Sequence, residues 1–159
     1  MAEKSGIVKE IATGLPAWAK GIIAVGVIGG GAYLIYKLVK KGKDILKPDE
    51  AKKDVKELEQ AGQVASYMDA QYIGFADAIY AARAGNNIFG TDEDAIYAVF
   101  MRMKNDLDIA KLITAFGVRR LSYSFQESTL GGFLKDDLDS EEIDTINTIL
   151  KKKGISYQF

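Results

Sequence analysis

The stretch GIIAVGVIGGGAYLIY, residues 21–36, contains no charged residue. Lys20 and Lys37 are the only charges within the longer apolar segment 16–39. A helix needs about 20 mostly apolar residues to cross a bilayer, and lysines near its ends can extend their amines into the interface. Residues 16–39 are therefore long enough, and we predict a transmembrane helix over this segment.

Aromatic and small residues support the same prediction. Trp18 lies near one end of the segment, and Tyr33 and Tyr36 lie near the other, as interfacial aromatics do. Gly26 and Gly30 form a small-xxx-small pair that permits close helix contact, and therefore a homo-oligomer. Two alternatives for the stretch stay open: a buried segment of a soluble protein, or a cleaved signal peptide, although no small-x-small cleavage site follows.

Charge is divided between the two parts of the chain. Residues 1–47 carry eight lysines and three acidic residues, a net charge of +5, which leaves −6 for the remainder because the whole chain carries −1. The positive-inside tendency then predicts a single-pass membrane protein whose C-terminal domain faces the cytoplasm or a particle interior. The densest basic cluster, which is also expected to bind anionic lipid headgroups, is Lys37, Lys40, Lys41 and Lys43.

Several kinds of chemistry are excluded by composition. The chain has no cysteine and no histidine, which excludes disulfides, histidine-dependent triads and the usual zinc sites. Nucleic-acid binding is not expected, because the basic cluster lacks interleaved aromatics and the rest of the chain is acidic. The acidic run Asp136–Asp144 lacks the glycine and alternating oxygens of an EF-hand loop, and suits a helix N-terminus instead. We expect no catalytic residues and no enzyme activity.

The organisation that we predict is an N-terminal segment (1–15), the membrane helix (16–39), a basic linker (40–48) and a helical domain (49–159). The fold class is all-α, a single transmembrane helix followed by a small bundle of about five to six helices. Helical periodicity predicts these helices at 49–66, 68–84, 91–103, 106–116, 128–138 and 139–153, with an irregular segment at 117–127.

Three local features refine this prediction. Thr91-x-x-Asp94 has the spacing of a capping box, so we expect Thr91 to cap the third helix. Asp106 is expected to cap the fourth helix, and Asp139 or Ser140 the last. The C-terminal segment 155–159 is apolar enough to dock back on the domain, or to contact something else.

Asp77–Ala82 (DAIYAA) followed by Phe89–Ile96 (FGTDEDAI) resembles the annexin repeat, in which a helix leads into a Gly-Thr-Asp-Glu turn that opens the next helix. The resemblance covers about one repeat, residues 77–153, and implies an annexin-like bundle. Annexins carry four or more repeats and no membrane anchor, so this chain is not a true multi-repeat annexin. Single units of this kind look like those in proteins of certain bacteria and their phages.

The resemblance also implies a calcium site. In annexins, carbonyl groups of the Gly-x-Gly-Thr loop and a later acidic side chain bind the ion. The matching residues here are Gly90, Thr91 and Glu127, while Ile88 stands in place of the first glycine. Calcium takes six to eight oxygen ligands, which a tight glycine turn can help to supply.

We therefore expect a non-enzymatic, membrane-anchored structural or adaptor protein that presents a helical domain to other protein subunits. The resemblance implies one setting for it, a phage virion in which it would link the lipid membrane to the protein shell. Two alternatives stay open: a calcium-dependent, annexin-like module that binds membrane lipids, and a lysis or envelope-active membrane protein.

Overall fold

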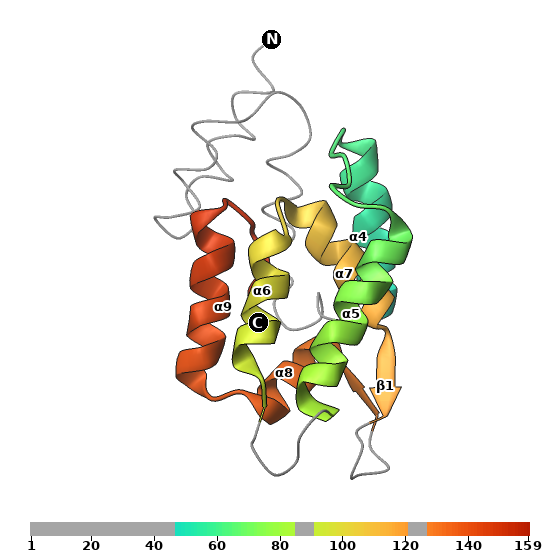
Figure 1. The fold of residues 1–159 in the computed structure, drawn as a ribbon. Helices are drawn as coiled ribbons and strands as arrows, with labels where there is room; N and C mark the ends of the chain where they lie inside the picture. Colours follow the sequence, from blue (N-terminus) through green and yellow to red (C-terminus); the bar gives the residue numbers. More distant parts are fainter. Residues whose placement is uncertain (1–46, 85–90, 121–126) are drawn as a thin grey trace.

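The computed structural model describes residues 47–84, 91–120 and 127–159. This part of the chain is mostly helical, as expected, with one small antiparallel hairpin added. Its elements are α4 (Pro48–Gln60), α5 (Asp69–Ala84), α6 (Glu93–Arg102), α7 (Asp106–Phe116), β1 (Val118–Arg120), β2 (Glu127–Thr129), α8 (Leu130–Asp137) and α9 (Ser140–Lys152) (Figure 1).

The predicted membrane helix 16–39 and the basic cluster after it lie outside the described residues. Among those that are described, no helix combines the length and the apolar character that crossing a membrane requires.

Helix α7 is the centre of the bundle. Its apolar residues occur on nearly all of its sides, so it must be surrounded by other elements to keep them from water. Helices α4 and α5 pack on α7, α6 packs on α5, and α9 packs on α6 (Figure 1). The α7 side chains that this packing buries to 2% exposure or less are Leu107, Ile109, Ala110, Leu112, Ile113 and Phe116.

Helix α4 is part of the core rather than a separate stalk. Ala51 and Leu58 are buried, with Asp54 between them, on the face that meets α7. The helix ends at Gln60 instead of the predicted residue 66. Gly62 has a φ of +86°, a conformation that glycine adopts at little cost and that turns the chain away from the helix.

The cap of α6 was predicted wrongly. Asp92, not Thr91, is the N-cap residue, and its carboxylate accepts a hydrogen bond from the Ala95 amide at 3.0 Å. The Thr91 hydroxyl instead donates to Asp137 at the end of α8, at 3.4 Å. A tertiary contact therefore takes the hydroxyl that a local capping box would have used.

Helix α7 spans the predicted residues, but its capping residue differs from the prediction. Asn105 is the N-cap residue and accepts from the Asp108 amide, whereas Asp106 lies inside the first turn. The α9 cap agrees with one of the two predicted residues, because Asp139 accepts from the amides of Glu141 and Glu142. The Glu142 side chain accepts from the Asp139 amide in return, which completes a capping box.

The hairpin replaces part of the segment that was expected to be irregular. Strands β1 and β2 pair antiparallel, with Val118 opposite Thr129 and Arg120 opposite Glu127. Each strand is three residues long, which is too short for an alternating pattern to reveal it in the sequence. The Arg119 guanidinium lies 2.8 Å from the Asp77 carboxylate, so the hairpin is held against α5.

The C-terminal segment docks on the domain, which was one of the two outcomes that its composition allowed. The Ser156 amide donates to the Asp106 carboxylate of α7 at 2.6 Å, and the Tyr157 hydroxyl donates to Asp54 of α4 at 3.2 Å. Phe159 forms backbone hydrogen bonds with the Asn147 side chain of α9. The segment therefore connects three helices that are distant in sequence.

The Asp106 carboxyl group, to which the C-terminal segment binds, has an unusually high pKa. The group is buried, and burial raises its pKa to about 6 although hydrogen bonds from Ser156 and from the Tyr157 backbone act in the opposite direction. Burial and the nearby Asp54 carboxylate likewise raise the pKa of Tyr157, so its hydroxyl stays protonated and can donate.

We predict that the free energy of unfolding increases as the pH decreases from 7 to 5. The folded-state pKa of Asp106 lies above its ordinary value of 3.8, so its contribution is complete below pH 3.8 and is lost as the pH rises through about 6. This group alone should contribute on the order of 1 kcal/mol between pH 7 and pH 5.

Urea unfolding of the full-length chain in detergent micelles, followed by circular dichroism at each pH, measures this contribution. Asp106→Asn, which keeps an oxygen acceptor but cannot titrate, should show the smaller dependence on pH. Parallel pH profiles for the two proteins would contradict the prediction.

Candidate functional site

A groove lies between helices α4, α5 and α7. It encloses about 530 Å³ and is open to the surface on one side. Helix α4 forms one wall, α5 forms the other and α7 forms the floor. The lining residues are Lys52, Val55, Lys56 and Glu59 from α4, Asp69, Tyr72 and Ile73 from α5, and Lys111, Thr114 and Ala115 from α7.

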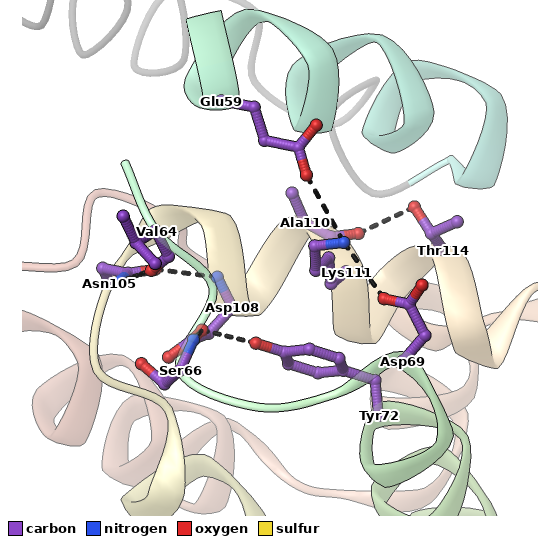
Figure 2. Close-up of polar contacts among 10 residues, drawn as sticks. All are labelled: Glu59, Val64, Ser66, Asp69, Tyr72, Asn105, Asp108, Ala110, Lys111 and Thr114. Carbon is purple, nitrogen blue, oxygen red and sulfur yellow. Dashed lines mark hydrogen bonds and ion pairs between the residues drawn. The ribbon is translucent and has the colours of Figure 1, made fainter. Parts of the chain in front are cut away.

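Lys111 connects the two walls of the groove. Its Nζ lies 3.1 Å from Asp69 Oδ1 and 3.5 Å from Glu59 Oε1, between the two helices (Figure 2). Burial alone would lower the pKa of Lys111, but the two carboxylates outweigh it and the pKa is raised, so the amine stays charged. Both acids are largely solvent-exposed, so each pair contributes less than about 1 kcal/mol. The main effect of Lys111 is to fix the spacing of the walls.

Apolar side chains are exposed along the same part of the molecule. Ile73 in the groove wall is 52% exposed, and Met68 in the connector just before α5 is 75% exposed. Asp69, Tyr72 and Ile73 share one helical face, because residues three and four apart are neighbours on a helix surface. Met68 directly precedes Asp69, the first groove-lining residue of α5.

The connector between α4 and α5, residues 61–68, is fixed to the start of α7. Asp108 is fully buried, and its carboxylate accepts from the Ser66 amide at 2.9 Å, from the Tyr72 hydroxyl at 2.6 Å and from the Lys104 amide at 2.8 Å. Burial and the Asp108 carboxylate raise the pKa of Tyr72, so this hydroxyl remains a donor.

A second set of bonds holds the same connector further along. The Asn105 side-chain amide donates to the Val64 carbonyl at 3.0 Å (Figure 2). The Leu107 amide donates to the Gln63 side chain at 3.1 Å. Despite this attachment, the Val64 side chain is 78% exposed. The connector thus presents apolar side chains to solvent on a backbone that is held by α7.

The sequence-predicted site residues are only partly described. The membrane-anchor residues, the headgroup-binding lysines and Gly90 lie outside the described ranges. Thr91 contacts Asp137, an acid that the sequence prediction did not include, and Glu127 is exposed on β2. In the part of the chain that the structure describes, no group of three or more metal-binding side chains comes together.

Calcium binding therefore stays a prediction. The groove itself was missed because the predicted helix 49–66 continued through most of the connector, residues 61–66 of 61–68. The available signal was Gly62, followed by the exposed pair Val64 and Met68 in an otherwise polar setting.

Scans against protein-family models, curated proteins and solved structures found no match to this chain. The annexin-like resemblance accordingly stays a prediction, and the function is argued from the chain itself.

Removing the Asp108 carboxylate should destabilise the domain strongly. We predict that Asp108→Ala lowers the free energy of unfolding by about 3 kcal/mol or more, because it leaves two partly buried amides and the buried Tyr72 hydroxyl without their acceptor. Tyr72→Phe removes one of these bonds and should cost about 1.5 kcal/mol.

Urea denaturation of the full-length variants gives both values. Asp136→Ala, an exposed aspartate in α8, is the matched control and should change stability by less than about 0.5 kcal/mol. If Asp108→Ala cost no more than Tyr72→Phe, the carboxylate would not hold the connector in the way described.

Proposed function

We propose that this chain is a non-enzymatic, membrane-anchored adaptor. Residues 16–39 hold it in a membrane, and the helical domain contacts another protein through the groove and the adjoining connector. The observation that carries the proposal is the exposure of Val64, Met68 and Ile73 on elements that are fixed to α7. A preorganised apolar surface loses little conformational freedom on binding, and so favours protein contact.

The chemistry of the groove supports binding over catalysis. Its floor amine, Lys111, is held between two carboxylates, and the nearest buried carboxylate, Asp108, is occupied by three donors. An active nucleophile or general base needs a partner that activates it and an open approach to substrate. The charged groups here are committed to holding the helices in place.

The charge of the domain favours protein over lipid as the contacting surface. Lys52 and Lys53 on the exposed side of α4 form ion pairs with Asp49 and Glu50. The chain after residue 47 carries a net charge of −6, which an anionic bilayer repels. The lysines that would bind headgroups are those of the linker, Lys37, Lys40, Lys41 and Lys43.

The annexin-like resemblance supports a particular setting for such an adaptor. Related single units look like those of bacteria and their phages, so we place this protein in the membrane of a phage virion. There it would connect the lipid layer to the protein shell. The membrane anchor would determine where the domain lies, and the groove would determine which protein the domain binds.

Anchoring is tested by alkaline carbonate extraction of membranes that contain the full-length chain. We expect the protein to remain in the membrane pellet, because 16–39 is long enough to span a bilayer. Val27→Arg places a charge in the middle of the segment and should release most of the protein. Ile7→Arg, the same kind of change outside the segment, should not. Release of the unmodified chain would contradict the anchor.

Protein contact is tested by a photo-cross-linking amino acid at position 68 in native membranes. We expect protease-sensitive adducts of higher mass, since this exposed position directly precedes the groove-lining residue Asp69. The same probe at Val118, which is 55% exposed on β1, is the matched control and should give few adducts. Adducts with lipid alone, or equal yields at both positions, would contradict the proposal.

A further inference from the structure

We propose that one end of the domain lies against the anionic headgroups of a lipid membrane, without calcium. This surface, which we call the basic end, consists of exposed side chains at and just after the C-terminal ends of α6 and α9. Its members are Met101, Arg102, Lys104, Lys151, Lys152 and Lys153. The contact goes beyond the proposed adaptor function, because it does not use the groove.

Helices α6 and α9 separate the charges of the domain, because each begins with acids and ends with bases. The two helices pack against each other and run in the same direction, so their basic ends lie together (Figure 1). The Lys153 amine joins these ends, since it donates to the carbonyls of Met101 and Met103. The acids at the two helix starts are Asp92, Glu93, Asp94, Asp139, Glu141 and Glu142.

The net charge of −6 after residue 47 does not prevent this contact, because the charge is unevenly distributed. The 13 residues of α9 separate its acidic start from its basic end by about 20 Å. At physiological ionic strength, interactions between exposed charges are screened over about 8 Å. A bilayer at the basic end therefore attracts the nearby lysines and only weakly repels the acids at the other end of these helices.

An exposed apolar side chain lies among these cations. Met101 is 56% exposed, and it stands next to Arg102. A surface that combines basic and apolar side chains can pair with headgroup phosphates and insert its apolar part at the boundary of the acyl chains. The acids that follow in sequence, Asp106 and Asp108, are buried and accept hydrogen bonds from the protein. The charges presented at this surface are therefore positive.

The kind of cation favours lipid over an acidic protein. Four of the five positive side chains of the basic end are lysines. Protein interfaces are depleted in lysine and enriched in arginine, whose planar guanidinium recognises a partner in a fixed geometry. A lysine amine is a point charge on a flexible stem, which can pair with any of many headgroup phosphates. The basic end therefore suits a fluid anionic surface.

The absence of cysteine allows a direct test on the full-length chain. Met101→Cys is labelled with a fluorophore, and the protein is reconstituted in vesicles of phosphatidylcholine, either alone or with added phosphatidylglycerol. Both vesicles contain a neutral lipid with a nitroxide quencher on its headgroup, and a calcium chelator is present throughout. The same fluorophore on Val118→Cys is the control, because this exposed position lies on β1, toward the opposite end of the domain (Figure 1).

We expect stronger quenching at position 101 when phosphatidylglycerol is present, and little difference at position 118. Each lysine near an anionic surface favours the bound arrangement about fivefold, so Lys151→Gln with Lys152→Gln should lower the ratio of bound to free domains about 25-fold. Quenching should then return to its value in phosphatidylcholine. The matched control is Lys52→Gln with Lys53→Gln, two exposed lysines of α4 whose loss changes the net charge equally. Circular dichroism verifies that both double variants are folded.

Equal quenching at position 101 in the two kinds of vesicle would overturn the inference, as would quenching that persists without Lys151 and Lys152. A photo-cross-linking amino acid at position 101 in native membranes examines the other partner. Protein adducts there, together with equal quenching in the vesicles, would mean that the basic end binds an acidic protein and that the lipid contact is wrong. The adaptor function is tested separately by the probe at position 68, so the two can fail independently.

Discussion

The Asp108 carboxylate is the interaction on which the rest of the domain depends. It is fully buried, and an unpaired carboxylate in such a place would cost several kcal/mol. The carboxylate accepts hydrogen bonds from three donors. They are Ser66 of the connector, Tyr72 of α5 and Lys104, the residue before the α7 cap. Because these donors come from different parts of the chain, one side chain sets the path of residues 61–68. That path creates the exposed apolar surface beside the groove.

A second buried carboxylate, Asp106, occupies the same turn of α7 and binds the C-terminal segment. The N-terminus of a helix carries partial positive charge and unpaired amides, so it is a favourable place for two buried acids. The start of α7 thus joins the connector, α5 and the C-terminal segment at one point, and Tyr157 extends the arrangement to Asp54 of α4. Side chains at the N-terminal end of α7, which forms the floor of the groove, therefore hold the walls α4 and α5 in place.

The groove combines weak individual interactions with a fixed framework. The two acids that pair with Lys111 are half to largely exposed, so these ion pairs contribute little to stability, but they link α4 and α5 across the groove. In the adaptor that we propose, a small surface of this kind would suffice, because the proposed membrane anchor would supply most of the localisation and the domain the choice of partner. Strong affinity is then not required of the groove.

The sequence by itself determined the helical character of the domain and the positions of its most regular elements. Helix α7 begins and ends where periodicity predicts, and Asp139 caps α9, because these features depend on residues within a few positions of one another. The apolar composition of residues 155–159 also indicated that this segment could dock on the domain. Only the tertiary structure decided the path of the connector, which residues cap α6 and α7, the short hairpin and the groove. The caps themselves bond amides three positions away, but the side chains around them also bond distant residues, such as Ser66 and Asp108, which are 42 positions apart, or Thr91 and Asp137, which are 46 apart. Local patterns carry no information about such partners, since a carboxylate that caps a helix and one that holds a distant loop have the same sequence signature.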